Sequence, residues 1–226
     1  MWDEQVASLG REAEVLAPHL PGFGGTAPAG DVLTMESAGD HVVAEMDRAG
    51  IERAVVCGLS MGGYVAFPMW RRHPDRFSGL VLADTRAEPD DDAGRERRRQ
   101  VAEKARAEGS EAIADEPPPL LSENADPAMW ERVREMIRHQ SGASIAAAAL
   151  GMAEREDARP LLPGIGVPVT VIVGAEDTLT PPSMSEAMVS AIPHAELIVL
   201  EGAGHLSNLE APDGFTEALR AALRRT

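Results

Sequence analysis

Four short runs of β-branched and other apolar residues, each bounded by turn-forming residues, constrain the fold of this chain more than any other feature. The runs are 53–57 (RAVVC), 80–83 (LVLA), 169–173 (VTVIV) and 197–200 (LIVL). None of them alternates apolar and polar residues, which indicates strands buried on both faces, as in a parallel sheet covered by helices. A weaker fifth strand is expected at 15–17.

Segments with the apolar spacing of helices lie between these runs. They are 36–49, 61–72, 181–192 and 213–223, and Thr180 is the expected N-cap of the third. Alternation of strands and helices is typical of an α/β fold, and 226 residues are enough for one such domain with an insert.

Residues 86–158 interrupt this alternation, because they are rich in charged residues and contain no convincing strand. Helices are expected within them at 94–107, 127–139 and 144–153. We therefore expect residues 1–85 and 159–226 to form an α/β core, with residues 86–158 as a helical insert between two strands. Insertions of this length in a compact domain usually serve a function.

Charge and cysteine usage exclude several classes of partner. The net charge of −16 argues against nucleic acid and anionic membranes, which both require a positive surface. The single cysteine, Cys57, excludes an internal disulfide, and no group of cysteines and histidines has the spacing of metal ligands. With no signal peptide and no membrane-spanning run apparent, we expect a cytoplasmic protein that uses no metal or cofactor and acts on a small molecule.

The stretch Gly58-Leu59-Ser60-Met61-Gly62 places a serine between the 53–57 strand and the helix that follows. This G-x-S-x-G pattern in a strand–turn–helix context is typical of a serine held at a sharp turn, with its hydroxyl exposed above the sheet. Side chains at 58 and 62 are expected to collide with neighbouring backbone, which explains both glycines. The Met61 N–H starts the helix and is the candidate donor to an oxyanion.

A serine hydroxyl becomes a nucleophile only when a base removes its proton. Among the six histidines, His205 is the candidate base, because it follows the last strand in a short glycine-containing loop. The other histidines are expected to be surface or capping residues; they are His19, His41, His73, His139 and His194.

The candidate base needs an acid that fixes its tautomer and stabilises the imidazolium. Asp177, just after the 169–173 strand, is the favoured candidate, and it gives the chain order Ser, Asp, His. Two alternatives remain open. Glu176 is adjacent but is expected to point away, and Asp84 ends the 80–83 strand.

Four stretches resemble the α/β-hydrolase superfamily, in its branch of small esterases and 3-oxoadipate enol-lactonases. They are GLSMGGYVA (58–66), RHPDRFSGLVLADT (72–85), VPVTVIVGAEDTLTPP (167–182) and GAGHLSNLEAPDGF (202–215). The resemblance implies a serine hydrolase that cleaves a small carboxylic ester or lactone through an acyl-enzyme on Ser60. His205 would be the base and then the acid, and Asp177 its partner.

The resemblance further implies that residues 86–158 cover the substrate pocket as a cap. Phe23, Trp130 and Met152 are candidate pocket residues, although each also suits an ordinary core position. Other chemistries share the same triad, namely carbon–carbon bond hydrolysis, perhydrolase or haloperoxidase activity and thioester hydrolysis. A non-catalytic ligand-binding protein is a further alternative.

Family members begin with a β-hairpin, a central strand and a His-Gly turn that supplies a second oxyanion donor. The stretch MWDEQVASL (1–9) resembles the helix that follows this turn, so the fold is expected to be N-terminally truncated. We therefore expect weak or absent hydrolytic activity. We also expect an open sheet edge beside the 53–57 strand, through which two copies could form a homodimer.

Overall fold

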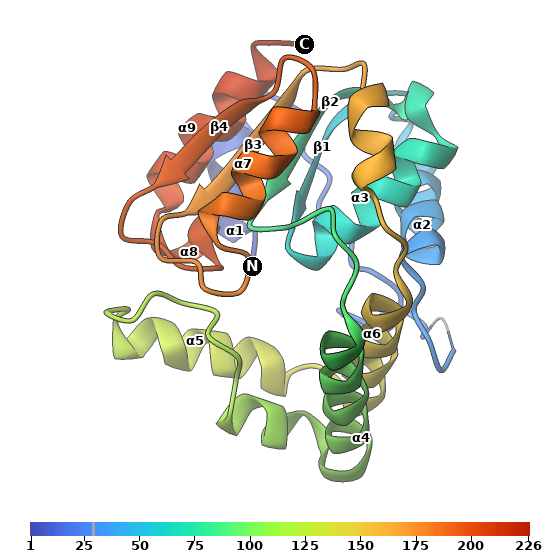
Figure 1. Cartoon of the computed structure of the whole chain (residues 1–226), viewed down its shortest axis with the longest axis vertical. Helices are drawn as coiled ribbons and strands as arrows, with labels where there is room; N and C mark the ends of the chain where they lie inside the picture. Colours follow the sequence, from blue (N-terminus) through green and yellow to red (C-terminus); the bar gives the residue numbers. More distant parts are fainter. Residues whose placement is uncertain (29) are drawn as a thin grey trace.

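The sheet lies between helices in the upper part of the computed structural model, which describes residues 1–28 and 30–226 (Figure 1). Within these residues it has four strands, β1 (Ala54–Leu59), β2 (Phe77–Ala83), β3 (Val169–Gly174) and β4 (Glu196–Leu200). They are arranged in sequence order, and every neighbouring pair is parallel. The predicted parallel α/β sheet is confirmed.

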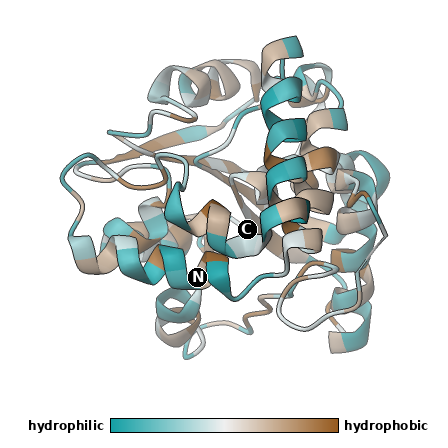
Figure 2. Cartoon of the chain, turned by 90° about the horizontal axis from the view of Figure 1, so that it is seen from below, coloured by the Kyte–Doolittle hydropathy of each residue, from teal (hydrophilic) through white to brown (hydrophobic). Residues whose placement is uncertain are grey.

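Helices cover both faces of this sheet (Figure 1). They are α1 (Asp3–Leu9), α2 (Met35–Ala49), α3 (Met61–Arg72), α7 (Pro182–Ala191), α8 (Ser207–Glu210) and α9 (Pro212–Leu223), with 3₁₀ turns at Pro74–Arg76 and Arg159–Gly164. Figure 2 shows hydrophobic strands inside and hydrophilic outer faces on the helices.

Strand β2 shows how the two faces are filled. Its Leu80 and Leu82 side chains join an apolar cluster with residues of α2, α3 and α7, whereas Val81 joins the cluster on the α9 side. All three are almost completely buried. Because both faces are covered, the strand carries apolar residues at successive positions rather than at alternate ones.

Three further helices, α4 (Asp92–Asp115), α5 (Pro127–Arg138) and α6 (Gly142–Glu154), form a separate group below the sheet in Figure 1. They belong to residues 86–158, which we call the helical segment. Helix α4 bends at Gly109, whose φ of 82° is outside the helical region. The predicted helices of this segment are therefore present, with α4 longer than expected.

A buried ion pair joins the two ends of the helical segment. The Arg155 guanidinium lies 2.9 and 3.0 Å from the two carboxylate oxygens of Asp90, and it also stacks on the ring of Tyr64 in α3. Burial raises the pKa of the Asp90 carboxyl, but hydrogen bonds and charge from Arg155 and Arg98 outweigh burial and hold it at about 2. This pair stays ionised and fixes both chain connections against the core.

The prediction of a strand at 15–17 is wrong. The chain there is irregular, and Val15 and Leu16 are 37% and 39% exposed. Strand β1 pairs with β2 alone among the described residues, so no neighbouring strand is available to hold a short extended segment in the sheet. The described residues therefore form no fifth strand.

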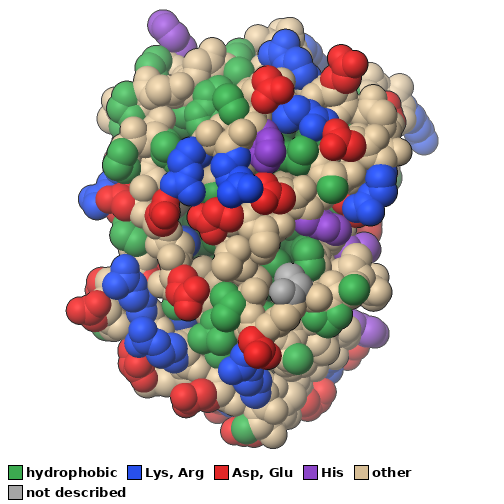
Figure 3. Space-filling model, turned by 90° about the vertical axis from the view of Figure 1, so that its right-hand side faces the viewer, with side chains coloured by type: hydrophobic (Ala, Val, Ile, Leu, Met, Phe, Trp, Pro, Cys, Tyr) green, Lys and Arg blue, Asp and Glu red, His purple; other side chains and the backbone are tan. Residues whose placement is uncertain are grey.

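Acidic and basic side chains lie interleaved on the face shown in Figure 3. Ion pairs also join α2 to α3, including Arg72 with Asp40 at 2.8 Å and Arg71 with Glu36 at 3.5 Å. No helix within 1–28 and 30–226 combines the length and hydropathy that a bilayer crossing demands.

Candidate active site

Ser60 occupies the sharp turn between β1 and α3. Its φ of 51° and ψ of −113° are rarely adopted by a residue with a side chain. Two contacts with the end of β2 hold this backbone, because the Ser60 N–H donates to the Ala83 carbonyl at 2.8 Å and the Thr85 hydroxyl donates to the Ser60 carbonyl at 2.8 Å. The serine is therefore presented by a turn anchored on two strands.

The glycines around Ser60 are needed at two positions, one of which differs from the expectation. A Cβ at Gly58 would lie 2.3 Å from the Gly62 carbonyl oxygen, which agrees with the predicted collision. A Cβ at Gly62 would meet nothing within 4 Å, so that prediction is wrong. The second crowded glycine is Gly63, where a Cβ would lie 2.4 Å from the Thr85 hydroxyl oxygen.

The side chains of Ser60, His205 and Asp177 form one hydrogen-bonded row. The Ser60 Oγ lies 2.7 Å from His205 Nε2, and the His205 Nδ1 lies 2.8 Å from Asp177 Oδ2. His205 and Asp177 are each only 3% exposed, whereas Ser60 is partly exposed. An imidazole held between a carboxylate and a hydroxyl can take the hydroxyl proton.

The Asp177 carboxylate is fixed by the turn that follows it. Its Oδ1 accepts the N–H groups of Leu179 and Thr180 at 2.8 and 3.0 Å, and its Oδ2 accepts the Thr180 hydroxyl at 2.7 Å. Burial alone would raise the pKa of this carboxyl, but the hydrogen bond and charge of His205, together with Thr180, hold it below its ordinary value. Asp177 is therefore ionised at neutral pH.

Thr180 was expected to cap the following helix, and this is wrong. Helix α7 begins at Pro182 with Pro181 as its N-cap, and the Thr180 side chain turns toward Asp177 instead. The spacing of an aspartate and a threonine three residues apart is typical of a turn that such side chains close. This spacing in the sequence could have predicted that the Thr180 side chain contacts Asp177.

The two alternative acids lie elsewhere. Glu176 is exposed, as expected. Asp84 is completely buried, but its Oδ1 accepts the Gly174 N–H at 2.9 Å and its Oδ2 accepts the Ser207 hydroxyl at 2.5 Å. Neither carboxylate is hydrogen-bonded to His205 in the described part of the chain.

Burial raises the pKa of Asp84 from 3.8 to about 7, against the lowering effect of the hydrogen bonds from Ser207 and Gly174. The folded chain therefore binds a proton there that the unfolded chain releases at lower pH. The contribution of Asp84 to the free energy of unfolding is therefore fully present below pH 3.8 and is lost as the pH rises to about 7.

We expect Asp84→Asn to raise the Tm relative to the unchanged chain at pH 8, and to raise it less at pH 5. Circular dichroism melts of both chains at the two pH values measure this difference. Asp90→Asn is the matched control, because the pKa of Asp90 is lowered to about 2 and its substitution should reduce the Tm at pH 8. A difference between Asp84→Asn and the unchanged chain that is equal at both pH values would contradict the assignment.

The candidate pocket residues divide between two apolar clusters. Phe23 and Met152 pack in the cluster that includes Met61 and Tyr64. Trp130 belongs to another cluster, which includes Leu206, the neighbour of His205. Met61 is the first residue of α3, and the N–H groups in the first turn of a helix have no carbonyl partner within that helix.

The helical segment contacts the loop that carries His205. Glu210 accepts the Gly204 N–H at 2.7 Å, and it also accepts the N–H and hydroxyl of Ser122 at 3.0 and 2.6 Å. The Leu206 N–H donates to the Leu120 carbonyl at 2.9 Å. These contacts join segments far apart in the sequence, and the sequence carried no local signal for the part played by Glu210.

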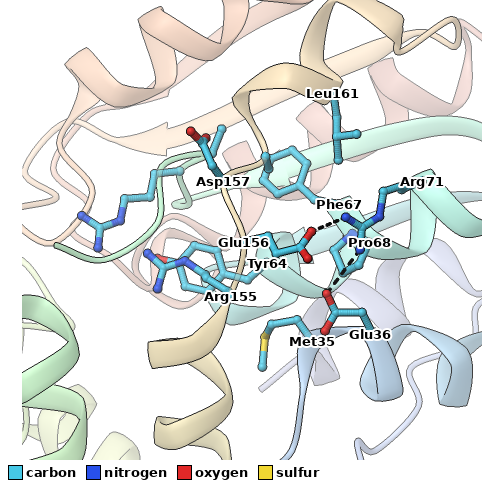
Figure 4. Close-up of a pocket in the computed structure, with 13 residues that line it drawn as sticks. Met35, Glu36, Tyr64, Phe67, Pro68, Arg71, Arg155, Glu156, Asp157 and Leu161 are labelled. Carbon is cyan, nitrogen blue, oxygen red and sulfur yellow. Dashed lines mark hydrogen bonds and ion pairs between the residues drawn. The ribbon is translucent and has the colours of Figure 1, made fainter. Parts of the chain in front are cut away.

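A hollow beside α2 and α3 lies apart from these side chains (Figure 4). Its lining includes Met35, Tyr64, Phe67 and Arg155, and its rim carries the ion pairs of Arg71. Its volume of about 20 Å³ is room for about one water molecule.

Three of the other histidines form hydrogen bonds away from Ser60: His73 with Asp40, His41 with the His19 carbonyl and His139 with Glu135.

Comparison with known proteins identifies the family of this chain. A family described as having the alpha/beta hydrolase fold matches residues 1–212. The chain belongs to this α/β-hydrolase family. Membership confirms the resemblance drawn from the sequence, and the named enzymes among its relatives establish that this α/β hydrolase comes from an enzyme family.

Among curated relatives, this α/β hydrolase is 29% identical to 3-oxoadipate enol-lactonase 2 of Acinetobacter baylyi, with 100% of the chain and 84% of the relative aligned. It is 31% identical to a pimeloyl-[acyl-carrier protein] methyl ester esterase of Neisseria meningitidis, over 97% of the chain and 87% of the relative.

The solved structures that resemble this chain also include an esterase and an enol-lactonase. A thermophilic esterase from Thermogutta terrifontis, with malate bound, is 42% identical with a TM-score of 0.95, over 100% of this chain and 85% of that one. The enol-lactonase from Burkholderia xenovorans LB400 is 34% identical with a TM-score of 0.88, over 99% and 85%.

Proposed function

We propose that this α/β hydrolase is a serine hydrolase that cleaves a small carboxylic ester or lactone through an acyl-enzyme on Ser60. The observation that carries the proposal is the hydrogen-bonded row of Ser60, His205 and Asp177, with distances of 2.7 and 2.8 Å. The names of relatives and structural neighbours, esterases and enol-lactonases, support the same class of substrate.

In the proposed reaction, His205 Nε2 takes the Ser60 proton as Oγ attacks the ester carbonyl. The Met61 N–H donates to the oxyanion that forms, and the α3 N-terminus favours the negative charge. His205 then gives its proton to the leaving alkoxide, which leaves an acyl group on Ser60. A water molecule, deprotonated by His205, attacks this acyl group and releases the acid, and Ser60 recovers its proton.

We further propose that the helical segment is a cap over the substrate. Phe23 and Met152 would border the substrate on the Met61 side, and Trp130 on the Leu206 side. An apolar wall of this kind suits a small acyl group. We expect turnover to depend on the Met61 N–H, since one such oxyanion donor is worth about 10²–10³ in kcat.

The test is hydrolysis of p-nitrophenyl acetate and butyrate and of a five-membered lactone by the purified chain. Saturable hydrolysis of any of these at neutral pH supports the proposal. A folded sample that binds such compounds without turnover would favour the alternative of a ligand-binding protein. Faster cleavage of thioesters or carbon–carbon bonds than of esters would favour the other chemistries of the same triad.

We also propose that the free edge of β1 mediates association of two copies. The edge is unpaired within the described residues, and unpaired edges promote strand pairing between molecules. Light scattering at micromolar concentration should give twice the mass of the chain, and Val55→Pro, which removes a donor on this strand, should reduce it. A monomer at all concentrations would contradict this part of the proposal.

A further inference from the structure

The end of strand β2 contacts all three segments that carry the proposed catalytic residues. Ala83 and Thr85 hold the Ser60 backbone, as described above. Between them, Asp84 reaches Gly174, which opens the turn leading to Asp177, and Ser207, two residues after His205. A single buried carboxylate thus joins the acid-bearing turn to the base-bearing loop.

These two loops also lie against each other. A Cβ at Gly174 would lie 2.1 Å from the Gly204 carbonyl oxygen, so little space separates them. Ser207, at the end of the loop that carries His205, is completely buried, and its hydroxyl donates a hydrogen bond to Asp84. The Glu176 N–H also donates to the Ala203 carbonyl at 2.9 Å, so Asp84 acts together with this bond and the close Gly174 contact to hold the loops in place.

Burying a carboxyl group is unfavourable unless its hydrogen bonds compensate, so a completely buried Asp84 needs a reason. It does not contact the Ser60 hydroxyl or His205. The titratable groups that face it are the Cys57 thiol from β1, Asp177 and His205. Its φ of 45° adds to the unfavourable terms that the surrounding structure must offset.

We propose that Asp84 is a positioning residue, which fixes the His205 loop relative to the Asp177 turn through its hydrogen bonds to Ser207 and Gly174. This inference rests on the proposed hydrolase function. A displacement of His205 by about 1 Å would reduce turnover by up to about 10²-fold. Substrate binding would change little, because Asp84 is completely buried and presents no surface to a substrate.

Four variants test the inference: Asp84→Ala, Asp84→Asn, Ser207→Ala and Ser185→Ala. Ser185 is the matched control, because it is also a completely buried serine, but its hydroxyl has no partner among the described residues. Asparagine keeps the acceptor for Gly174, and its amide can donate to a rotated Ser207 hydroxyl. It is therefore the conservative rescue of the alanine variant.

With kcat expressed per folded molecule, we expect falls of about 10²-fold for Asp84→Ala and about tenfold for Ser207→Ala, with KM within about twofold. Asp84→Asn and Ser185→Ala should stay within about threefold of the unchanged chain. Equal kcat for Ser207→Ala and Ser185→Ala would overturn the inference. A loss in Asp84→Asn as large as that in Asp84→Ala would overturn it as well.

Hydrogen exchange of the peptide 203–210 provides a readout that does not depend on turnover. Exchange there should be faster in Ser207→Ala and Asp84→Ala than in Ser185→Ala, and unchanged exchange in both would refute the role of Asp84. If the unchanged chain hydrolyses no ester, the proposed function fails by itself, and exchange still decides whether Asp84 positions the loop.

Discussion

Replacing Ser60 with alanine is expected to reduce ester hydrolysis to the uncatalysed background. Loss of the serine in another enzyme with this triad lowers kcat by about 10⁶-fold, because acyl transfer then has no nucleophile. The Ser60 side chain is partly exposed and its Oγ is hydrogen-bonded to His205, so the fold should be unaffected by Ser60→Ala. Hydrolysis of p-nitrophenyl butyrate with a matched melting curve measures both effects.

The control for this substitution is Ser190→Ala, which removes an exposed hydroxyl bonded to the Glu186 carbonyl in α7. It should retain full activity. Retention of one tenth or more of the activity in Ser60→Ala would exclude Ser60 as the nucleophile. The site would then need another group near His205.

Replacing Asp177 with asparagine is expected to lower kcat by about 10⁴-fold. The carboxylate accepts a hydrogen bond from the His205 Nδ1–H at 2.8 Å, which leaves Nε2 free to accept the Ser60 proton. An amide in its place presents an N–H donor to Nδ1 and favours the wrong tautomer. Steady-state kinetics at pH 8 should show the loss in kcat, with KM nearly unchanged.

Two neighbours provide graded controls for Asp177→Asn. Glu176→Gln removes the adjacent exposed carboxylate and should leave kcat unchanged. Thr180→Val removes one of the four hydrogen-bond donors to Asp177 and should cause a smaller loss than Asp177→Asn. If Glu176→Gln lost more activity than Asp177→Asn, the assignment of the acid would be wrong.

The sheet could be predicted from the sequence because its signal is local. Runs such as 169–173 are apolar at every position, and a strand buried on both faces requires this pattern. The segment 15–17 carried a similar but shorter pattern and is not a strand. A strand needs a hydrogen-bonded neighbour, and three residues of sequence contain no information about one.

The candidate site also contains a part that could be predicted from the sequence and a part that could not. Ser60, Asp177 and His205 each follow a strand and could be selected from their positions in the sequence. The contacts that hold these three side chains in place could not be predicted, because the contacts join segments that are distant in the sequence. Gly63 is needed because of Thr85, and Asp84 is buried between Gly174 and Ser207; these contacts depend on packing that only the folded chain defines.

Mass spectrometry of the intact chain treated with a serine-directed fluorophosphonate tests the central claim most directly. We predict one adduct per chain, located on the peptide that contains Ser60, and formed much more slowly in His205→Gln because the hydroxyl then has no base. No adduct on a folded, ester-hydrolysing sample, or an adduct on a different residue, would contradict the account.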